Sequence, residues 1–412
     1  MTSAASQSDF NPFSPENLRN PTQFDKMLRD QDPVHWSDVA HGWLVTRYDD
    51  VVNGLRDSRL SADRMIFLVY QLAGRADQSI ISDFMQSFSK QMLMMDGANH
   101  LRLRRQANPA FSPQALDAWR PAIRRITEEL VSAVLPRGRM DLAKETAYHL
   151  PSLIIAEVLG VPPESRSRFQ KWGEDIARFA IGVAGMDIVQ VAKEANQAVL
   201  EFNAFLESLI EDRRRNPGND MLSQMIHIQE GGGMAMEELM SNALLILTAG
   251  HVTTSDQINS GIYDLLTHPD QLQLLREDPS LIKPALEEML RFSPPTSFGI
   301  RVATETFELR GRTIRKGDVV MLGLAAANRD PNVFPDPDRF DIRRDHTHQK
   351  HLSFAFGAHH CLGAGLARRE LEIAFEILLA KMPNLRLDEE LQPQRKPPSI
   401  LFRNFDSMPV RW

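Results

Sequence analysis

Cys361 is the only cysteine in this chain of 412 residues, and its neighbours suit close contact with a flat ligand. It lies in the segment FAFGAHHCLGAGLARRE, with Gly357 before it and Gly363 after it. Glycine has no Cβ, so the backbone here can approach a ligand closely. The helix-like run that follows would point N–H groups at the sulfur and favour the thiolate, the metal-binding form. The alternatives are a buried structural cysteine and a zinc site shared with the two preceding histidines, although consecutive side chains diverge.

The composition excludes several classes of protein. A single cysteine rules out a disulfide within the chain and any site that needs two thiolates. The net charge, 47 − 54 = −7, gives no general attraction to nucleic acid. The N-terminus lacks the basic start and apolar run of a signal peptide. No stretch approaches the roughly 20 apolar residues of a membrane span. We therefore expect a cytoplasmic protein with no membrane span and no nucleic-acid partner.

Helical patterns dominate the middle of the chain, between about residues 99 and 291. The longest, at 236–268, would extend roughly 50 Å at 1.5 Å per residue. Residues 59–95 read as loop-like, and short alternating patterns before and after the helical region predict strands. Since no linker or internal repeat divides the sequence, we expect a single domain over residues 1–412, mainly α with small β-sheets. Residues 1–12 are expected to form a flexible N-terminal tail.

The segment around Cys361 resembles the haem-binding loop of cytochrome P-450 proteins. The matching residues are Phe354, Gly357, His359, Cys361 and Gly363. The resemblance extends over most of the chain and implies a cytochrome P-450 fold, with the long central helix over haem b and Cys361 as the axial iron ligand. Such a thiolate pushes electron density onto the iron and favours O–O cleavage. Ala355 departs from the family, which most often has glycine there; because alanine is small, we expect little effect.

The two propionates of a haem need cations, and the resemblance supplies candidates for them. His100 and Arg104 are four residues apart, on one face of a helix, and are similar to the family's propionate clamp. Arg301 and His359 match two further members of that set. Each residue alone would be an ordinary surface charge, but together they are expected to bind the propionates. His360 has no such role and is expected to serve local packing.

The segment EEMLR places Glu288 and Arg291 three residues apart, adjacent on one helical face. An isolated pair of this kind would be an ordinary surface ion pair. Here it resembles the family's Glu-x-x-Arg motif, whose partner is an arginine in the meander before the cysteine. The segment PDRF offers Arg339 as that third member. We expect these three residues to be structural.

The segment TAGHVTTSD, in the middle of the long helix, resembles the oxygen-binding groove of the family. Ala249, Gly250 and Thr253 match, and the resemblance makes them the expected catalytic residues. The small pair would open a groove for dioxygen, and the threonine would help to deliver protons. The family's acid is replaced by Val252, which cannot relay a proton.

Several explanations of this replacement stay open. Thr253 and ordered water could deliver protons alone or with His251 or Asp256, or the substrate could bring its own polar group. The enzyme could also perform chemistry with other proton needs, such as peroxide-driven turnover or oxidative coupling. Alternatively, Thr253 is only a helix threonine that hydrogen-bonds to the preceding turn.

The substrate pocket can be placed only by resemblance. Its expected segments are residues 62–95, 165–200, 242–253, Pro295–Ile300 and the strand near Ile400–Leu401. Its apolar side chains would include Met65, Phe67, Phe84, Met85, Phe179 and Phe298. Such a lining predicts a large apolar cavity with few polar groups, suited to a bulky natural product.

The expected function is a monooxygenase that inserts one oxygen atom into a small-molecule substrate, either free or bound to a carrier protein. Electrons would come from a separate ferredoxin or flavodoxin-type donor with its reductase. The basic residues expected at its docking face are Arg102, Arg105, Arg368 and Arg369. The catalytic alternative is a haem-thiolate enzyme for coupling, desaturation or peroxygenation. The non-enzymatic alternative is a haem-dependent sensor or binding protein.

Overall fold

The computed structural model describes residues 10–182, 186–348, 350–396, 399, 401–402 and 405–412. Its helices are α1 (Pro15–Arg19), α2 (Pro21–Gln31), α3 (Tyr48–Arg56), α4 (Met65–Tyr70), α5 (Ser82–Ser89), α6 (Gly97–Ala107), α7 (Pro113–Asp117), α8 (Arg120–Val134), α9 (His149–Val158), α10 (Arg166–Ile181), α11 (Ile188–Arg215), α12 (Met221–Glu230), α13 (Met236–Thr267), α14 (Pro269–Glu277), α15 (Ile282–Phe292), α16 (Leu324–Ala327) and α17 (Ala364–Lys381). Its strands are β1 (Val34–Ser37), β2 (Gly42–Val45), β3 (Leu60–Ser61), β4 (Arg139–Asp141), β5 (Phe298–Ala303), β6 (Phe307–Leu309), β7 (Arg312–Ile314), β8 (Val319–Gly323), β9 (Arg386–Leu387), β10 (Gln394–Arg395), β11 (Phe405–Ser407) and β12 (Pro409–Arg411). The fold is therefore mainly α with small β-sheets, as the sequence predicts.

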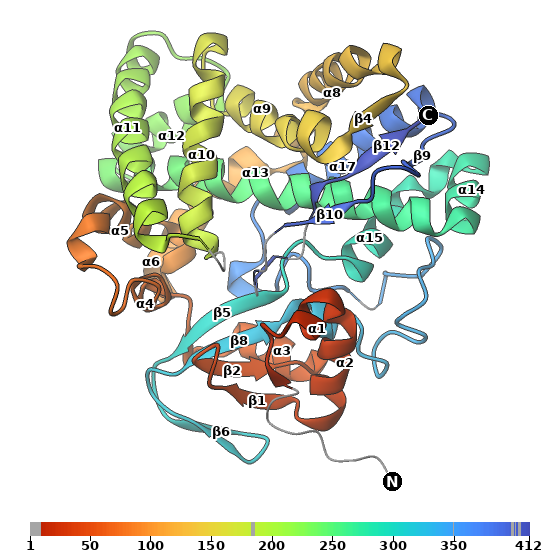
Figure 1. Cartoon of the computed structure of the whole chain (residues 1–412). Helices are drawn as coiled ribbons and strands as arrows, with labels where there is room; N and C mark the ends of the chain where they lie inside the picture. Colours follow the sequence, from red (N-terminus) through yellow and green to blue (C-terminus); the bar gives the residue numbers. More distant parts are fainter. Residues whose placement is uncertain (1–9, 183–185, 349, 397–398, 400, 403–404) are drawn as a thin grey trace.

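The longest helix, α13, crosses the helical part of the molecule and packs against α9, α10, α15 and α17 (Figure 1). Its first turn is fixed by the Glu238 side chain, which accepts a hydrogen bond from the Ala235 N–H at 2.9 Å. It ends at Thr267, two residues before Pro269, because the residue before a proline is disfavoured in helical conformation. The predicted central helix is confirmed.

The largest sheet has the strand order β1-β2-β8-β5-β3 and lies below the long helices in Figure 1, beside α1, α2 and α3. Strands β2 and β8 are parallel, whereas β5 pairs antiparallel with both β8 and β3. All five residues of β8 are buried, which explains why its sequence VVMLG is apolar throughout rather than alternating. Strand β5, which carries Arg301, is thus held in this sheet by hydrogen bonds to β8 along most of its length and to β3 at its end.

Two sequence expectations need adjustment. Residues 59–95, expected to be loop-like, contain the short helices α4 and α5. Leu68 of α4 and Phe84 and Phe88 of α5 are buried in the core, whereas Ile66 and Tyr70 of α4 are exposed. Of the expected N-terminal tail, residues 1–9 lie outside the described part of the chain. Phe10 is buried and packs with Phe24 and Leu28 of α2.

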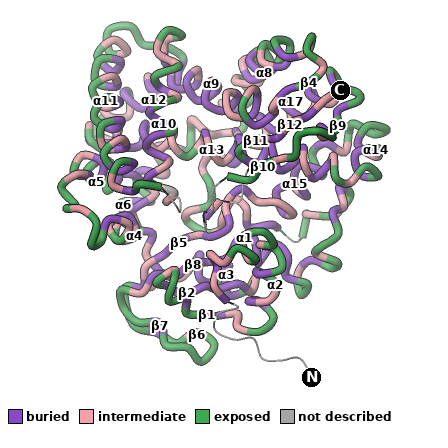
Figure 2. Tube along the Cα trace, viewed as in Figure 1, coloured by how far each residue is buried: buried purple, intermediate pink, exposed green. Residues whose placement is uncertain are grey.

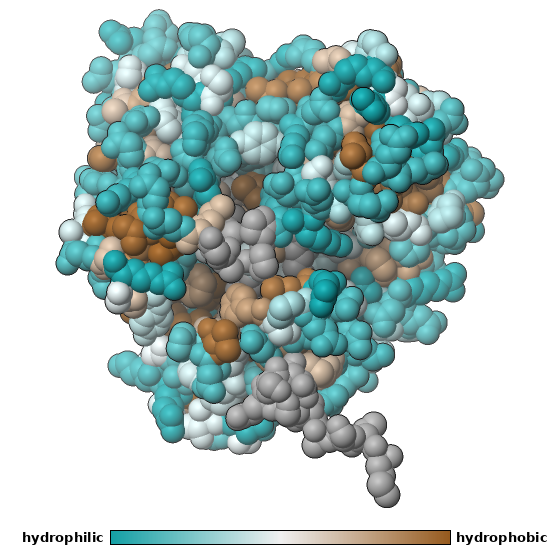
Figure 3. Space-filling model, viewed as in Figure 1, coloured by the Kyte–Doolittle hydropathy of each residue, from teal (hydrophilic) through white to brown (hydrophobic). Residues whose placement is uncertain are grey.

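The buried residues form one large apolar cluster among the helices and two smaller clusters around the sheet (Figure 2). Packed side chains therefore hold α13 and α17 in fixed positions. The face drawn in Figure 3 is mainly hydrophilic, with an apolar group of side chains near α5. Among the helices of the described residues, we find none with the length and apolar character that a membrane crossing requires.

Candidate active site

A cavity of about 450 Å³ lies between α13, the segment that precedes α17, and strand β5. Cys361 is exposed to this cavity, and so are Ala249 and Thr253 on the opposite helix. Residues far apart in the sequence therefore meet at one site. The structure brings together every predicted haem-contacting and oxygen-side residue except Gly357, which lies against the Leu55 backbone and does not line the cavity.

The cysteine segment is held by its own backbone. The Cys361 N–H donates to the Phe354 carbonyl at 2.8 Å, and α17 begins three residues later. Burial raises the pKa of the Cys361 thiol, while N–H donors from Gly363 and Ala364 and the charge of Arg104 act in the opposite direction. The pKa of Cys361 is therefore raised, whereas the sequence predicts a lowered pKa. The effect of burial is larger than that of the N–H groups at the start of α17. A metal ion would reverse this balance, since coordination deprotonates a thiol.

Two residues of this segment have left-handed backbone conformations. Gly357 has φ +77°, and a Cβ there would lie 3.1 Å from the Leu55 carbonyl oxygen. Ala355 has φ +56°, a conformation that disfavours residues with a Cβ. The sequence expectation considered only the size of Ala355, but the backbone angle is what makes glycine the favourable residue there.

One side of the cavity carries one buried and two half-buried cations without matching anions. Arg64, Arg104 and Arg301 all line it, and none of them has a carboxylate within ion-pair distance among the described residues. Burial, together with the charge of Arg301, lowers the pKa of Arg64 to about 10, and burial also lowers that of Arg301. Uncompensated buried charge is costly, so this wall fits a ligand with acidic groups.

Two histidines extend the same wall. The rings of His100 and His359 stack with centroids 4.0 Å apart, and Nε2 of His359 lies 3.6 Å from Asp96 Oδ1. Burial and the neighbouring charges of His100 and Arg301 lower the pKa of His359 to about 4. At neutral pH these histidines are therefore hydrogen-bonding groups, and the arginines provide the positive charge. The set fits the two propionates of a haem, and Cys361 is the thiol donor that iron would need.

Arg64 is a member of this wall that the sequence interpretation missed. It precedes the apolar run of α4, in the segment SADRMIFLV. An arginine at the edge of an apolar run was the available signal, but no local pattern distinguishes it from a surface charge.

On the opposite wall, the Thr253 hydroxyl donates to the Ala249 carbonyl at 2.9 Å. A hydrogen bond to the preceding turn is the arrangement expected if Thr253 were only a helix threonine. The Thr253 side chain nevertheless also lines the cavity. A Cβ on Gly250 would lie 2.7 Å from the Ile155 side chain, so this glycine allows α9 to pack closely on α13. Val252 also lines the cavity, which leaves this wall without an acid at the expected position.

The two titratable residues near Val252 do not line the cavity. The Nε2 atom of His251 lies 2.9 Å from the Tyr148 carbonyl oxygen, and burial lowers the His251 pKa to about 4. Asp256 is fully buried and binds the Lys396 ammonium at 2.9 Å. Both are committed to packing α13 against its neighbours.

The substrate side of the cavity is apolar, as predicted, but only some of the expected residues form it. Phe67, Phe298 and Leu401 line it, whereas Ile400 lies outside the described residues. Phe84 and Phe179 do not: both are fully buried and their rings meet edge-on at 5.1 Å, behind the wall. Met65 and Met85 are also absent from the lining, so these four assignments were wrong. The pattern of apolar residues could not distinguish the cavity wall from the core behind it.

The Glu-x-x-Arg motif forms a buried cluster, but its third member is not Arg339. Arg291 donates to Glu288 at 2.7 and 2.8 Å, and the guanidinium of Arg344 reaches Glu288 Oε1 at 3.2 Å. The Arg339 side chain is 67% exposed and points to Asp341, while its carbonyl accepts hydrogen bonds from both buried arginines. The sequence expectation of Arg339 is therefore corrected to Arg344, five residues later.

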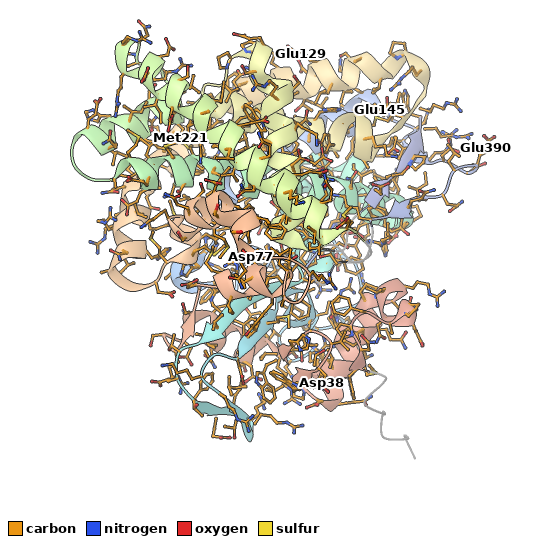
Figure 4. The ribbon with its side chains drawn as sticks, turned by 60° about the vertical axis from the view of Figure 1, so that its left-hand side comes forward. Asp38, Asp77, Glu129, Glu145, Met221 and Glu390 are labelled. Carbon is orange, nitrogen blue, oxygen red and sulfur yellow. The ribbon has the colours of Figure 1, made fainter. Side chains whose placement is uncertain are left out.

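Four buried polar residues on the cavity wall were not predicted: Gln91, Thr254, Gln257 and Glu370. Glu370 had a visible signal, because it lies four residues after Leu366 and four before Ala374, on the apolar face of α17. A carboxylate on such a face is unusual. Glu129 and Glu390, for comparison, project from the outer edge of the molecule (Figure 4).

Comparison with known proteins agrees with this geometry. The family model described as "Cytochrome P450" matches residues 64–281 and 275–407. The chain is 36% identical to cytochrome P450 CYP107DY1 of Priestia megaterium, over 96% of this chain and 97% of the relative. It is 34% identical to the polyketide biosynthesis cytochrome P450 PksS of Bacillus subtilis, over 97% and 98%. The solved structure of P450BioI with an acyl carrier protein carrying hexadec-9Z-enoic acid superposes with a TM-score of 0.87 at 34% identity, covering 97% of this chain and 100% of that one.

Proposed function

Because the chain belongs to the cytochrome P450 family, we propose that it is a haem-thiolate monooxygenase that inserts one oxygen atom from O2 into a C–H or C=C bond of a bulky apolar substrate. The observation that carries this proposal is the position of Cys361. Its sulfur faces the cavity, opposite Thr253, with N–H donors from Gly363 and Ala364. Haem b, when bound, supplies the iron that activates dioxygen, with the thiolate as its electron-donating ligand.

The residues of the site would have three roles: binding the propionates, stabilising the thiolate and supplying protons. Arg64, Arg104 and Arg301 would neutralise the propionates, with His100 and His359 as hydrogen-bonding partners. The N–H groups at the start of α17 would stabilise negative charge on the sulfur.

Thr253 would hold a proton, or a water that carries one, at the oxygen side of the cavity. Its Oγ1 atom already donates to the Ala249 carbonyl, so its lone pairs are free to accept a hydrogen bond from a water in the cavity. Ala249 and Gly250, which also line the cavity, keep the side chains of this turn of α13 small.

The apolar wall supports a bulky natural-product substrate. The names of two relatives favour this class, since one acts in polyketide biosynthesis and another was crystallised with an acyl carrier protein. Gln91 is a polar group on this wall whose amide atoms have no partner among the described residues. A hydroxyl or carbonyl group on the substrate would satisfy it.

Electrons would reach the site from a separate ferredoxin or flavodoxin-type protein. Of the four basic residues expected at the docking face, Arg105 is exposed and free of ion pairs within the described chain. The other three bind carboxylates of this protein: Arg102 with Glu238, Arg368 with Glu287 and Arg369 with Asp117. These pairs reduce the positive charge available to an acidic partner. The cytoplasmic location stays a prediction.

Val252 favours a second candidate function, a haem-thiolate enzyme for coupling, desaturation or peroxygenation, because the expected acid is missing from the oxygen side. A haem-dependent sensor is the non-enzymatic alternative. Product analysis distinguishes them: hydroxylated or epoxidised product supports the monooxygenase, a coupled or desaturated product supports the second candidate, and no product from any bound ligand supports the sensor.

The proposal is tested first by the absorbance of the reduced protein with carbon monoxide. We expect the strongly red-shifted Soret band of thiolate ligation, and we expect Cys361→Ser to lose it. Ala358→Ser, at an exposed position three residues before Cys361, is the matched control and should retain the band. A correctly folded, haem-loaded protein that never shows the band would contradict the proposal.

The substrate class is tested by titrating the ferric protein with macrolactones, terpenoids, fatty acids, aromatic amino acids and carrier-bound acyl groups. A saturable shift of the Soret band with one class identifies the substrate family. A response to carrier-bound ligands alone would place the enzyme on an assembly line.

A further inference from the structure

A buried ion pair links α13 to the residue that follows strand β10, a strand that passes beside this helix (Figure 1). The Lys396 ammonium donates to Asp256 Oδ1 at 2.9 Å. The Asp256 side chain is fully buried, whereas the Lys396 side chain is 40% exposed. Removing one partner of a buried ion pair leaves an uncompensated charge and is strongly unfavourable. The pair therefore firmly connects two elements that are 140 residues apart in the sequence.

On α13, the ion pair lies next to the oxygen side of the cavity. Asp256 follows Val252 by four residues, so the two side chains lie one turn apart on the same face of the helix. Val252 and Thr253 line the cavity, whereas Asp256 does not. The ion pair is therefore anchored within one turn of the oxygen-side wall.

At its other end, the ion pair is close in sequence to the substrate side of the cavity. Leu401 and Phe402, called here the cavity segment, line the cavity a few residues after Lys396. Their backbone is held by the chain before β5: the Ser297 N–H donates to the Leu401 carbonyl at 2.7 Å, and Thr296 pairs with Phe402. Lys396 adds a second attachment, which connects the same part of the chain to α13.

Strands β10 and β11 also have contacts that do not involve Asp256. The rings of Tyr263, on α13, and Phe405 lie 4.9 Å apart, and the Arg395 guanidinium lies 4.3 Å from the centroid of the Phe405 ring. These contacts should keep the strands in place when the ion pair is absent. Loss of the pair is therefore expected to loosen the cavity segment rather than to unfold the chain.

We propose that the Asp256–Lys396 ion pair fixes the cavity segment relative to α13 and so sets the fit between the substrate wall and the oxygen side. The importance of this fit for catalysis rests on the proposed monooxygenase function, whereas the link itself does not. Asp256 and Lys396 are positioning residues, since neither lines the cavity.

The ion pair is expected to depend on pH. Burial raises the pKa of Asp256 to about 7, while the Lys396 ammonium acts in the opposite direction. The carboxyl group is therefore ionised above this pH, and the ion pair is lost as the pH falls through about 7. The pKa of His251, on the same helix, is affected by the charges of Lys396 and of His149 on α9. Burial lowers the His251 pKa to about 4, so His251 stays neutral in this range, and His149 is the residue that needs a control.

The first test is hydrogen exchange of the Ser297 N–H in the ferric holoprotein, measured without substrate at about pH 8. In Lys396→Met this exchange should be about tenfold faster, because the cavity segment loses a charge-assisted attachment. Lys396→Arg keeps the cation and should exchange like the wild type. Lys381→Met is the surface control, because Lys381 is exposed at the end of α17. Equal exchange in the wild type and Lys396→Met would overturn the proposal.

The second test repeats this measurement at about pH 6. Asp256 is then neutral, so the difference between Lys396→Met and the wild type should disappear. Asp256→Asn should behave like Lys396→Met at both pH values, and His149→Gln should keep the pH dependence of the wild type. A difference that persists unchanged in acid would contradict the assignment of Asp256 as the titrating partner.

The third test measures the fit of the cavity wall with two azoles that shift the Soret band of the ferric protein. Imidazole is small and reports iron binding alone, whereas clotrimazole fills a large apolar cavity. Lys396→Met should weaken clotrimazole binding about tenfold and leave imidazole binding unchanged. Equal losses for both azoles would mean that the substitution disturbs the haem site itself, against the proposal. If neither azole shifts the band of the wild type, the proposed function fails, while hydrogen exchange still decides whether the ion pair holds the cavity segment.

Discussion

The guanidinium of Arg344 lies against Glu288, with its Nε atom 3.2 Å from Oε1, inside the cluster that joins α15 to the meander. Glu288 and Arg291 are both fully buried, and the Arg344 side chain is 13% exposed. The cluster therefore holds the chain that leads to the cysteine segment by buried, charge-assisted hydrogen bonds.

Arg344→Ala should lower the free energy of unfolding by about 3–5 kcal/mol, because it removes one partner of a buried ion cluster. Arg339→Ala should change it by less than about 0.5 kcal/mol, since that side chain is on the surface. Urea unfolding at equal haem loading measures both. Equal losses in the two variants would contradict the assignment of Arg344.

Acid should weaken the same cluster. Burial alone would raise the pKa of Glu288, but hydrogen bonds from Arg291 and His346 together outweigh it and lower the pKa to about 2. A carboxyl whose folded pKa is below its unfolded value, about 4.3, stabilises the fold above that value. This contribution is lost as pH falls from about 4.3 to about 2. The acid-unfolding curve of Glu288→Gln, compared with wild type, should lack that part of the pH dependence; parallel curves would contradict it.

Ala355→Gly should stabilise the protein by about 0.5–1 kcal/mol, since relief of the left-handed strain exceeds the extra freedom of glycine in the unfolded chain. Ala358→Gly is the control, because Ala358 has no positive φ and should lose up to about 1 kcal/mol. Chemical unfolding of the holoproteins measures the difference. The opposite order would show that Ala355 is not strained.

Arg301→Met should have opposite effects on the two forms of the protein. The apoprotein should become more stable, because a buried cation that repels Arg64 is removed. Haem should be lost about 10–100-fold faster, as expected for a charge-assisted hydrogen bond worth about 1.5–3 kcal/mol. Transfer of haem to excess apomyoglobin gives the rate, and Arg312→Met, 53% exposed, is the control. Unchanged haem loss would exclude Arg301 from the propionate set.

Thr253→Ala should divert electrons from product to peroxide, with roughly tenfold less product per reductant consumed. Thr253→Ser keeps the hydroxyl and should resemble the wild type. Peroxide and product are measured together with an oxidised ligand of the panel. Thr267→Ala, which removes an exposed back-bonded hydroxyl at the end of α13, should have no effect. If Thr253→Ala behaves in the same way, its hydroxyl serves only the helix.

The sequence by itself determined the features that depend on local spacing. The positions of Phe354, Gly357 and Cys361 relative to one another define a loop before a helix, and the length of α13 follows from its uninterrupted pattern. The pairing of Glu288 with Arg291 also follows, since residues three apart on a helix are neighbours.

Only the tertiary structure decided which distant residues meet. The side chain of Arg344, and not that of Arg339, contacts Glu288, which depends on the path of the chain through the meander. Phe84 and Phe179 contact each other behind the cavity wall, because other side chains lie between them and the cavity. Arg64 and Glu370 became significant once the structure placed both side chains on the cavity wall. The free energy of a charge or a carboxyl depends on what surrounds it, and the surroundings come from elements hundreds of residues apart.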